Sequence, residues 1–289
     1  MKKLLKAAVA VSIALSCSPT YADKNDKDEI FSSSTFKAME LRNIGPAYMS
    51  GRIADIAIDQ NNPSTWYTAV GSGGVWKTTN AGTTWTPIFD DQPVYSIGDV
   101  TIAPSNSNII WVGTGENNGG RHISFGDGVY KSVDGGQTWK NMGLSKSEHV
   151  SDIIIHPTNP DIVWVSAQGP LWSGGGERGL YKTTDGGETW KQVLTPADKW
   201  TGVTSLLIDP RNPDKLYAAT WARQRSIGAY VGTNEGAGIH TSNDGGETWI
   251  ELKTGLPEGN MGKIGMAISP MNPDVIYATI ETDNRGGGF

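Results

Sequence analysis

The sequence has little cysteine, little charge and, after its first residues, no long apolar run. One cysteine, Cys17, stands among 289 residues, so the chain cannot form an internal disulfide. Charged residues make up 19% of the chain, and 30 acidic residues outnumber 24 basic ones, which gives a net charge of −6. Nucleic-acid phosphates attract basic chains rather than acidic ones. These absences exclude a disulfide scaffold and argue against a nucleic-acid partner.

The one apolar run lies at the N-terminus and has the order of a secretory signal. Lysines near the start precede the apolar residues 7–15, and small residues follow up to Ala22. The run is too short to cross a bilayer. We expect cleavage near Ala22, which leaves an exported chain, periplasmic or extracellular, without cysteine or a transmembrane helix. The alternative is a lipoprotein anchored through Cys17, but Leu15 lies one residue too close to Cys17 for the usual lipobox.

Glycine and tryptophan, in contrast, are abundant, with 37 and 11 residues, a composition that favours a turn-rich β protein. One phrase repeats: "DGGETW" at 185–190 and 244–249, "DGGQTW" at 134–139 and a variant, "NAGTTW", at 80–85. The phrase returns about every 50 to 60 residues, a period typical of propellers and solenoids. Each unit also has two strand-like segments upstream of the phrase, separated by a turn. With one strand on either side of the phrase, this predicts four-stranded antiparallel blades and therefore an all-β propeller.

We call each repeated phrase a box and predict that it is structural. At a hairpin tip the aspartate can accept backbone N–H groups, the glycines supply positive φ, and the tryptophan buries its ring between strands. The residues concerned are Asn80, Trp85, Asp134, Trp139, Asp185, Trp190, Asp244 and Trp249. A box has too few acidic ligands for calcium, and the histidines lack zinc spacing. We expect no metal site and no cofactor.

The expected organisation is a signal peptide (1–22), a flexible leader (23–35) and a propeller segment (36–289). Blades are expected at about 50–92, 93–146, 147–197 and 198–256, followed by a partial blade at 257–289. Five upstream strand pairs face four boxes, so the fifth unit stops where its third strand should begin. An unclosed propeller exposes strand edges, and we therefore expect a truncated part of a larger propeller. The alternative is that four blades and an irregular half-blade close on themselves.

The order of the strands predicts which end of the blades carries function. The boxes lie at one end, and the connections from second to third strand and from blade to blade lie at the other, which we call the rim. The long insertions 116–127, 168–179 and 221–238 all fall on the rim, where binding and catalysis are favoured because the loops rest on a rigid scaffold. The ligand-binding candidates are Arg52, Arg121, His122, Trp172, Arg178, Trp200, Arg223, Arg225 and Tyr230. Glu148 and His149 lie in a rim connection as well.

Four boxes in register, with "LRNIGPAYMSGRIADIAID" and "GSGGVWKTTNAGTTW", resemble the Asp-box (BNR-repeat) β-propellers. That superfamily includes sialidases, xyloglucanase-type glycoside hydrolases and the sortilin ectodomain, and the chain looks most like exported bacterial proteins labelled sortilin-like or glycosyl hydrolase. Two departures weaken an enzymatic expectation. The catalytic aspartate of the xyloglucanase-type motif falls on Gly71, and the "R-I-P" element of sialidases is matched only by Arg52, Ile53 and Ala54.

Three functions follow as hypotheses. The first is an exported propeller that recognises a peptide, a protein or a glycan on its rim, for which mixed charged and aromatic loops are suited. The alternative is a glycoside hydrolase, which needs a pair of carboxylates; the candidates are Glu116, Asp127, Glu177 and Glu235. The second alternative is a structural or interaction segment of a larger envelope protein.

Overall fold

The structure, a computed structural model, describes residues 51–283. The expected signal peptide, the leader and the start of the propeller segment lie outside the described residues. Within the described range the chain is almost entirely β, with a single 3-10 turn, η1 (Ser145–Ser147), and its strands form four sheets of four strands and two sheets of two. The expectation of an all-β chain built from four-stranded antiparallel units is confirmed.

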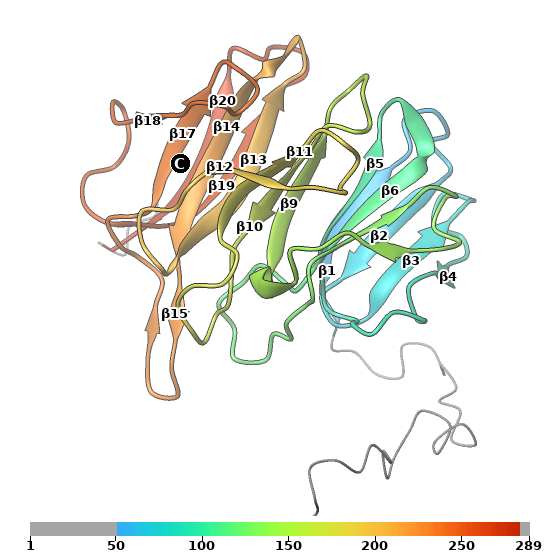
Figure 1. Cartoon of the computed structure of the whole chain (residues 1–289), viewed down its shortest axis with the longest axis horizontal. Helices are drawn as coiled ribbons and strands as arrows, with labels where there is room; N and C mark the ends of the chain where they lie inside the picture. The colour runs from blue at the N-terminus through green and yellow to red at the C-terminus, as the bar shows by residue number, and fades with distance from the viewer. Residues whose placement is uncertain (1–50, 284–289) are drawn as a thin grey trace, which may run out of the picture. The chain divides into compact units, whose positions relative to one another are not determined.

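Each four-stranded sheet is a meander of antiparallel neighbours (Figure 1). The first contains β1 (Ile53–Ile58), β2 (Trp66–Val70), β3 (Gly74–Thr78) and β4 (Thr86–Pro87). The second contains β5 (Ile97–Ala103), β6 (Asn106–Thr114), β7 (Val129–Ser132) and β8 (Lys140–Asn141), and the third β9 (Val150–Ile155), β10 (Val163–Ala167), β11 (Gly179–Thr183) and β12 (Lys191–Leu194). The fourth contains β13 (Thr201–Asp209), β14 (Asn212–Ala222), β17 (Gly238–Ser242) and β18 (Ile250–Leu252). A hairpin of β15 (Gln224–Arg225) and β16 (Tyr230–Val231) leaves the fourth sheet, and β19 (Met261–Ile268) pairs with β20 (Ile276–Thr282).

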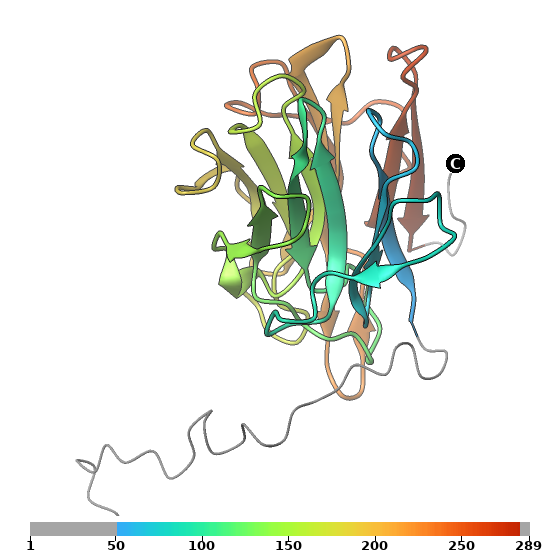
Figure 2. The same cartoon turned by 90° about the vertical axis from the view of Figure 1, so that its right-hand side faces the viewer.

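Successive sheets pack face to face, with their first strands side by side (Figure 2). Side chains of a strand alternate between its two faces, so one strand supplies two cores. On β9, Ile153 and Ile155 lie in the core shared with the second sheet, whereas Ile154 packs against the core shared with the fourth. Trp111 and Trp164, both buried, fill these two cores. Apolar burial of such large side chains is the main stabilising contribution.

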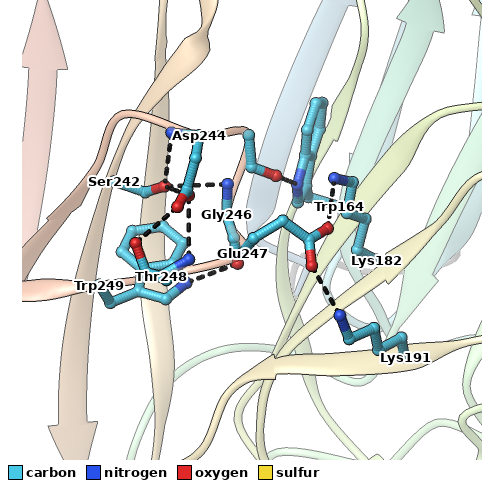
Figure 3. A network of polar contacts seen from close by, with 10 residues as sticks. Trp164, Lys182, Lys191, Ser242, Asp244, Gly246, Glu247, Thr248 and Trp249 are labelled. Carbon is cyan, nitrogen blue, oxygen red and sulfur yellow. Dashed lines mark hydrogen bonds and ion pairs between the residues drawn. The ribbon is translucent and has the colours of Figure 1, made fainter.

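The box that contains Asp244 shows how the repeated phrase closes a hairpin (Figure 3). Asp244 Oδ1 accepts hydrogen bonds from Thr248 N at 2.9 Å and Ser242 Oγ at 2.7 Å, and Ser242 Oγ accepts one from Gly246 N at 2.9 Å. The boxes at 134 and 185 repeat these bonds. Hydrogen bonds from the threonine favour the ionised aspartate, and they lower the pKa of Asp134 to about 2.

Each aspartate box also accepts a donor from the preceding sheet, a role that the repeat alone does not reveal. Lys77 Nζ donates to Gly135 O at 2.9 Å, and Lys131 Nζ donates to Gly186 O at 3.0 Å. In the last box, Trp164 Nε1 donates to the carbonyl of the first glycine at 3.1 Å (Figure 3). The box therefore links neighbouring sheets as well as forming a hairpin turn.

Candidate functional site

The long rim loops contact one another across several sheets. They connect β6 to β7, β10 to β11, and β14 to β17, and the β15–β16 hairpin extends from the last of them (Figure 1). Gln168 Nε2 donates to Trp221 O at 2.8 Å and Arg225 Nε donates to Gly119 O at 2.6 Å. Residues distant in sequence are thus joined into one surface.

The centre of this surface is residues 116–119, which we call the cross-loop. It leaves the second sheet, yet Asn117 Nδ2 donates to Thr204 Oγ1 on β13 at 3.0 Å. Lys263 Nζ on β19 donates to Asn117 O at 2.7 Å, and Arg223, after β14, donates to Asn118 O. The cross-loop therefore ties the second sheet to the fourth and to the β19–β20 pair.

Glu116, the first residue of the cross-loop, forms an ion pair with Arg52 at the start of the first sheet. Both Arg52 Nε and Arg52 Nη2 donate to the Glu116 carboxylate, whose side chain is only 8% exposed. The carboxylate also lies against Gly71, because a Cβ on Gly71 would stand 2.9 Å from Glu116 Oε2. Glu116 therefore occupies the space beside the glycine on which the catalytic aspartate of the xyloglucanase-type motif falls. The bonds to Glu116 raise the pKa of Arg52, as expected for an ionised pair.

Glu148 lies next to the chain segment that begins the cross-loop. Its carbonyl accepts a hydrogen bond from Gly126 N at 2.7 Å, and a Cβ on Gly115 would stand 1.8 Å from that carbonyl oxygen. Glu148 has a φ of 59°, one of three positive values among the non-glycine residues described. Burial raises the pKa of its carboxyl, an effect that Arg178 and Arg223 oppose.

The two arginines near Glu148 are buried. Arg223 is fully buried, and its Nε is without a hydrogen-bond partner in the described structure. Burial, followed by the charge of Arg178, lowers the pKa of Arg223 to about 9. Arg178 donates to five main-chain carbonyl oxygens and so holds the β10–β11 loop in place. Burial lowers its pKa to about 10.

His149 completes this buried polar group. Burial, with a smaller effect from Arg223, lowers the pKa of its imidazole well below the usual value, so the ring is neutral at pH 7. The ring is hydrogen-bonded to the backbone of Glu116, and Nδ1 has no partner among the described residues. His149 thus helps to hold the cross-loop in place through the backbone of Glu116.

The other sequence candidates are dispersed over the rim. Asp127 accepts a hydrogen bond from Tyr130 Oη at 2.8 Å, and Glu177 accepts one from Lys146 N at 2.8 Å. Arg225 stacks on the Tyr230 ring at 4.5 Å. Arg121, His122, Trp172, Tyr230 and Glu235 are exposed, and Trp200 is half-buried. The structure brings Glu116, Arg52 and Arg223 together and leaves the rest at separate points.

Two exposed rim aromatics were absent from the sequence candidates. Tyr95 is 57% exposed and Phe125 is 69% exposed, and Tyr95 Oη lies 3.1 Å from Ser124 Oγ. Aromatic side chains that stay exposed in connections offer apolar faces on which a ligand can stack. Both residues could have been named from the sequence, because they lie in connections that the strand order assigns to the rim.

A row of three aspartates was missed as well: Asp99 is buried, and Asp55 and Asp152 are half-buried. Asp55, Asp99 and Asp152 occupy equivalent positions on β1, β5 and β9. All three line a cavity of about 360 Å³. Val100 N donates to Asp55 at 3.3 Å and Leu206 N to Asp152 at 2.8 Å, so these two carboxyls link one sheet to the next. Burial raises the pKa of Asp152 to about 7 and that of Asp99 well above its usual value. The repetition favours a structural role over a catalytic one.

Neither a metal cluster nor a membrane helix is found in residues 51–283. No group of three or more His, Cys, Asp or Glu side chains in that range is placed to hold a metal ion. No helix in the same range is long and apolar enough to cross a membrane.

Comparisons with known proteins agree with this architecture. The Sortilin-Vps10 family model (sortilin, neurotensin receptor 3) matches residues 127–258. A xyloglucanase from Paenibacillus sp. is 25% identical over 188 residues, which are 63% of this chain and 17% of the relative. Xyloglucanase Xgh74A from Acetivibrio thermocellus is 23% identical over 274 residues, covering 78% of this chain and 29% of the relative.

Solved structures show the same likeness. A crystal structure of an ancestral GH74 enzyme aligns with a TM-score of 0.62 at 23% identity, over 80% of this chain and 28% of that one. The chain has the fold of a β-propeller of the sortilin-like, xyloglucanase type. The GH74 xyloglucanase from Xanthomonas campestris aligns with a TM-score of 0.58 at 15% identity, over 81% of this chain and 36% of that one. The chain spans less than a third of the length of the two xyloglucanases from Paenibacillus sp. and Acetivibrio thermocellus.

These likenesses change the order of the functional hypotheses. The main expectation, a propeller that only binds a ligand, receives no specific support, whereas the alternative, a glycoside hydrolase, is favoured by the xyloglucanase relatives. A carbohydrate is accordingly the ligand class that the relatives suggest. The low identity to the solved structures establishes the fold alone.

Proposed function

We propose that the rim is the substrate-binding face of an exported glycoside hydrolase that acts on a polysaccharide. The observation that carries this proposal is the Glu116 carboxylate. It stands beside Gly71, where the xyloglucanase-type motif has its catalytic aspartate, and it forms an ion pair with Arg52. Glycosidases need one ionised carboxylate to activate water or to attack the sugar. Glu116 supplies such a group even though residue 71 is glycine.

Other residues of the rim suit a sugar chain. Tyr95, Phe125, Trp172 and Tyr230 expose aromatic faces on the same rim. Sugar rings carry apolar faces as well as hydroxyl groups, so exposed rings and nearby polar side chains can hold a glycan in a defined orientation. Asp127 and Glu177 are less suitable acids, because each already accepts a hydrogen bond that holds a rim element in place.

The test is hydrolysis of soluble polysaccharides by the full chain, with xyloglucan as the first substrate because the relatives bear its name. We expect new reducing ends with the native protein and a loss of about 10²-fold or more with Glu116→Gln, the range typical for removal of an essential carboxylate. Glu188→Gln, an exposed acid at the box end, is the matched control. Retention of polysaccharide without any release would refute the hydrolase and favour the binding propeller.

A further inference from the structure

We propose that Glu148 is the general acid of the rim, and that it works with Glu116 as its carboxylate partner. This inference rests on the proposed hydrolase function and names the second residue of the pair. Glu148 donates its carboxyl proton to the glycosidic oxygen as the bond from that oxygen to C1 breaks. A water molecule attacks C1, and Glu116 accepts the proton that this water releases. Proton exchange with solvent then restores both carboxyl groups, so the net reaction consumes one water.

Position is the first argument. Glu148 packs its main chain against Gly115, the residue immediately before Glu116, and the ring of His149 is hydrogen-bonded to the Glu116 backbone. The side chains of Glu116 and Glu148 are both close enough to the buried Arg223 to act on its charge. Two carboxyl groups from separate rim connections therefore lie within electrostatic range of one arginine, as a pair that flanks a scissile bond can do.

The two carboxyl groups differ in their surroundings. Arg52 donates two N–H groups to Glu116, so that carboxylate has a positively charged partner. In residues 51–283 no group donates a hydrogen bond to the Glu148 carboxyl, and burial raises its pKa. Opposite environments for two neighbouring carboxyl groups are the pattern that separates an acid from a base.

Backbone conformation gives an independent argument. A φ of 59° is unfavourable for a residue with a side chain, and glycine or asparagine would adopt it more easily. Such strained residues cluster at functional sites. Here the strain places a glutamate, rather than a small turn residue, beside the cross-loop.

The decisive experiment compares two substrates with the full chain. With polysaccharide, whose leaving group is a sugar alcohol, Glu148→Gln should lower kcat/KM by about 10²–10⁴-fold, because the alcohol needs a proton. With a dinitrophenyl glycoside of the same sugar, whose leaving group needs no proton, we expect Glu148→Gln to lose less than about 10-fold. Glu116→Gln should lose activity on both substrates. Glu188→Gln should change neither.

The pH profile gives a second readout. In the native protein the loss of activity at high pH should follow deprotonation of Glu148, and this limb should vanish in Glu148→Gln with the activated substrate. The charges that act on the Glu148 carboxyl are those of Arg178 and Arg223, whose pKa values of about 10 and about 9 lie above pH 8, and the next residue, His149, is neutral at pH 7. His149→Gln, which removes an imidazole but no acid, should leave the limb in place.

The outcomes separate the two proposals. If the native chain releases no sugar, both the hydrolase function and the role of Glu148 are wrong. If the native chain is active and Glu148→Gln is equally impaired on both substrates, or unimpaired, Glu148 is not the acid while the hydrolase stands. Glu148→Gly guards against misfolding: it should melt at or above the native temperature, because it relieves the backbone strain, and should still lose activity on polysaccharide.

Discussion

The two ends of the blades differ in how completely their polar groups are hydrogen-bonded. At the box end the same short bonds recur: Asp134, Asp185 and Asp244 each bind the threonine four residues later, and all three stay ionised. At the rim the buried polar atoms Arg223 Nε and His149 Nδ1 have no partner in the described structure. Satisfied polar groups stabilise a fold, whereas unsatisfied buried groups cost stability and persist where function needs them. The difference agrees with the proposal that the box end maintains the scaffold and that the rim binds and cleaves the substrate.

The largest loss of stability is expected for a variant that breaks the contact between a box and the preceding sheet. Trp164→Ala removes a buried indole and its hydrogen bond to Gly245 O. We expect a loss of about 3–5 kcal/mol in the free energy of unfolding, measured by urea denaturation. Trp172→Ala, at a rim tryptophan that is 48% exposed, should cost less than about 1 kcal/mol. Equal losses at both positions would contradict the division between the two ends.

Between the two ends, the aspartate row predicts a pH effect. Burial raises the pKa of Asp152 to about 7 and raises that of Asp99 as well. For an acid with a raised pKa in the folded state, the folded form binds more protons than the unfolded form. Stability is therefore fully present below the usual pKa and is lost as pH rises through the folded pKa.

We accordingly expect the free energy of unfolding to fall between pH 4 and pH 7, by up to about 1.4 kcal/mol per pH unit for each such group. Asp99→Asn removes one titrating group and should flatten this slope in urea denaturation measured at several pH values. A chain that is less stable at pH 5 than at pH 7 would refute the proposed protonation of the row.

A smaller effect sharpens the comparison among the boxes. Ala81 in the first box has a φ of 52°, where Gly135, Gly186 and Gly245 in the other boxes have 72°, 71° and 70°. Ala81→Gly should raise the free energy of unfolding by about 1 kcal/mol, because the left-handed region penalises a Cβ. Thermal melting checks this. Gly245→Ala is the reverse experiment and should lower the melting temperature.

The smallest effect concerns the exposed charges of the box end. Glu247 bridges Lys182 and Lys191 at 3.0 Å and 2.6 Å (Figure 3). Glu247→Gln should lower the free energy of unfolding by less than about 1 kcal/mol, since exposed ion pairs are screened by water and salt. The difference from the native protein should shrink further in 1 M salt. A larger loss that persists in salt would show that the box is held by charge rather than by its backbone bonds.

The sequence foretold the box end well because a box is local: Ser242 and Thr248 lie within four residues of the aspartate that they bind. It also named Glu116 and Arg223 as rim residues. It did not foretell that Arg52 binds Glu116 across 64 residues or that Glu148 adjoins the cross-loop, because such contacts depend on how sheets pack. The aspartate row was within reach, since an aspartate occupies the same strand position in three consecutive units.

One measurement tests the central claim, that the rim performs chemistry, most directly. Xyloglucan is incubated with the full native chain and, separately, with Glu116→Gln, and the anomeric protons of new reducing ends are followed by NMR. We predict that new reducing ends accumulate with the native chain and fall to the level of a protein-free control with the variant. Equal release by both proteins would contradict the assignment of Glu116, and release by neither would contradict the proposed activity on this polysaccharide.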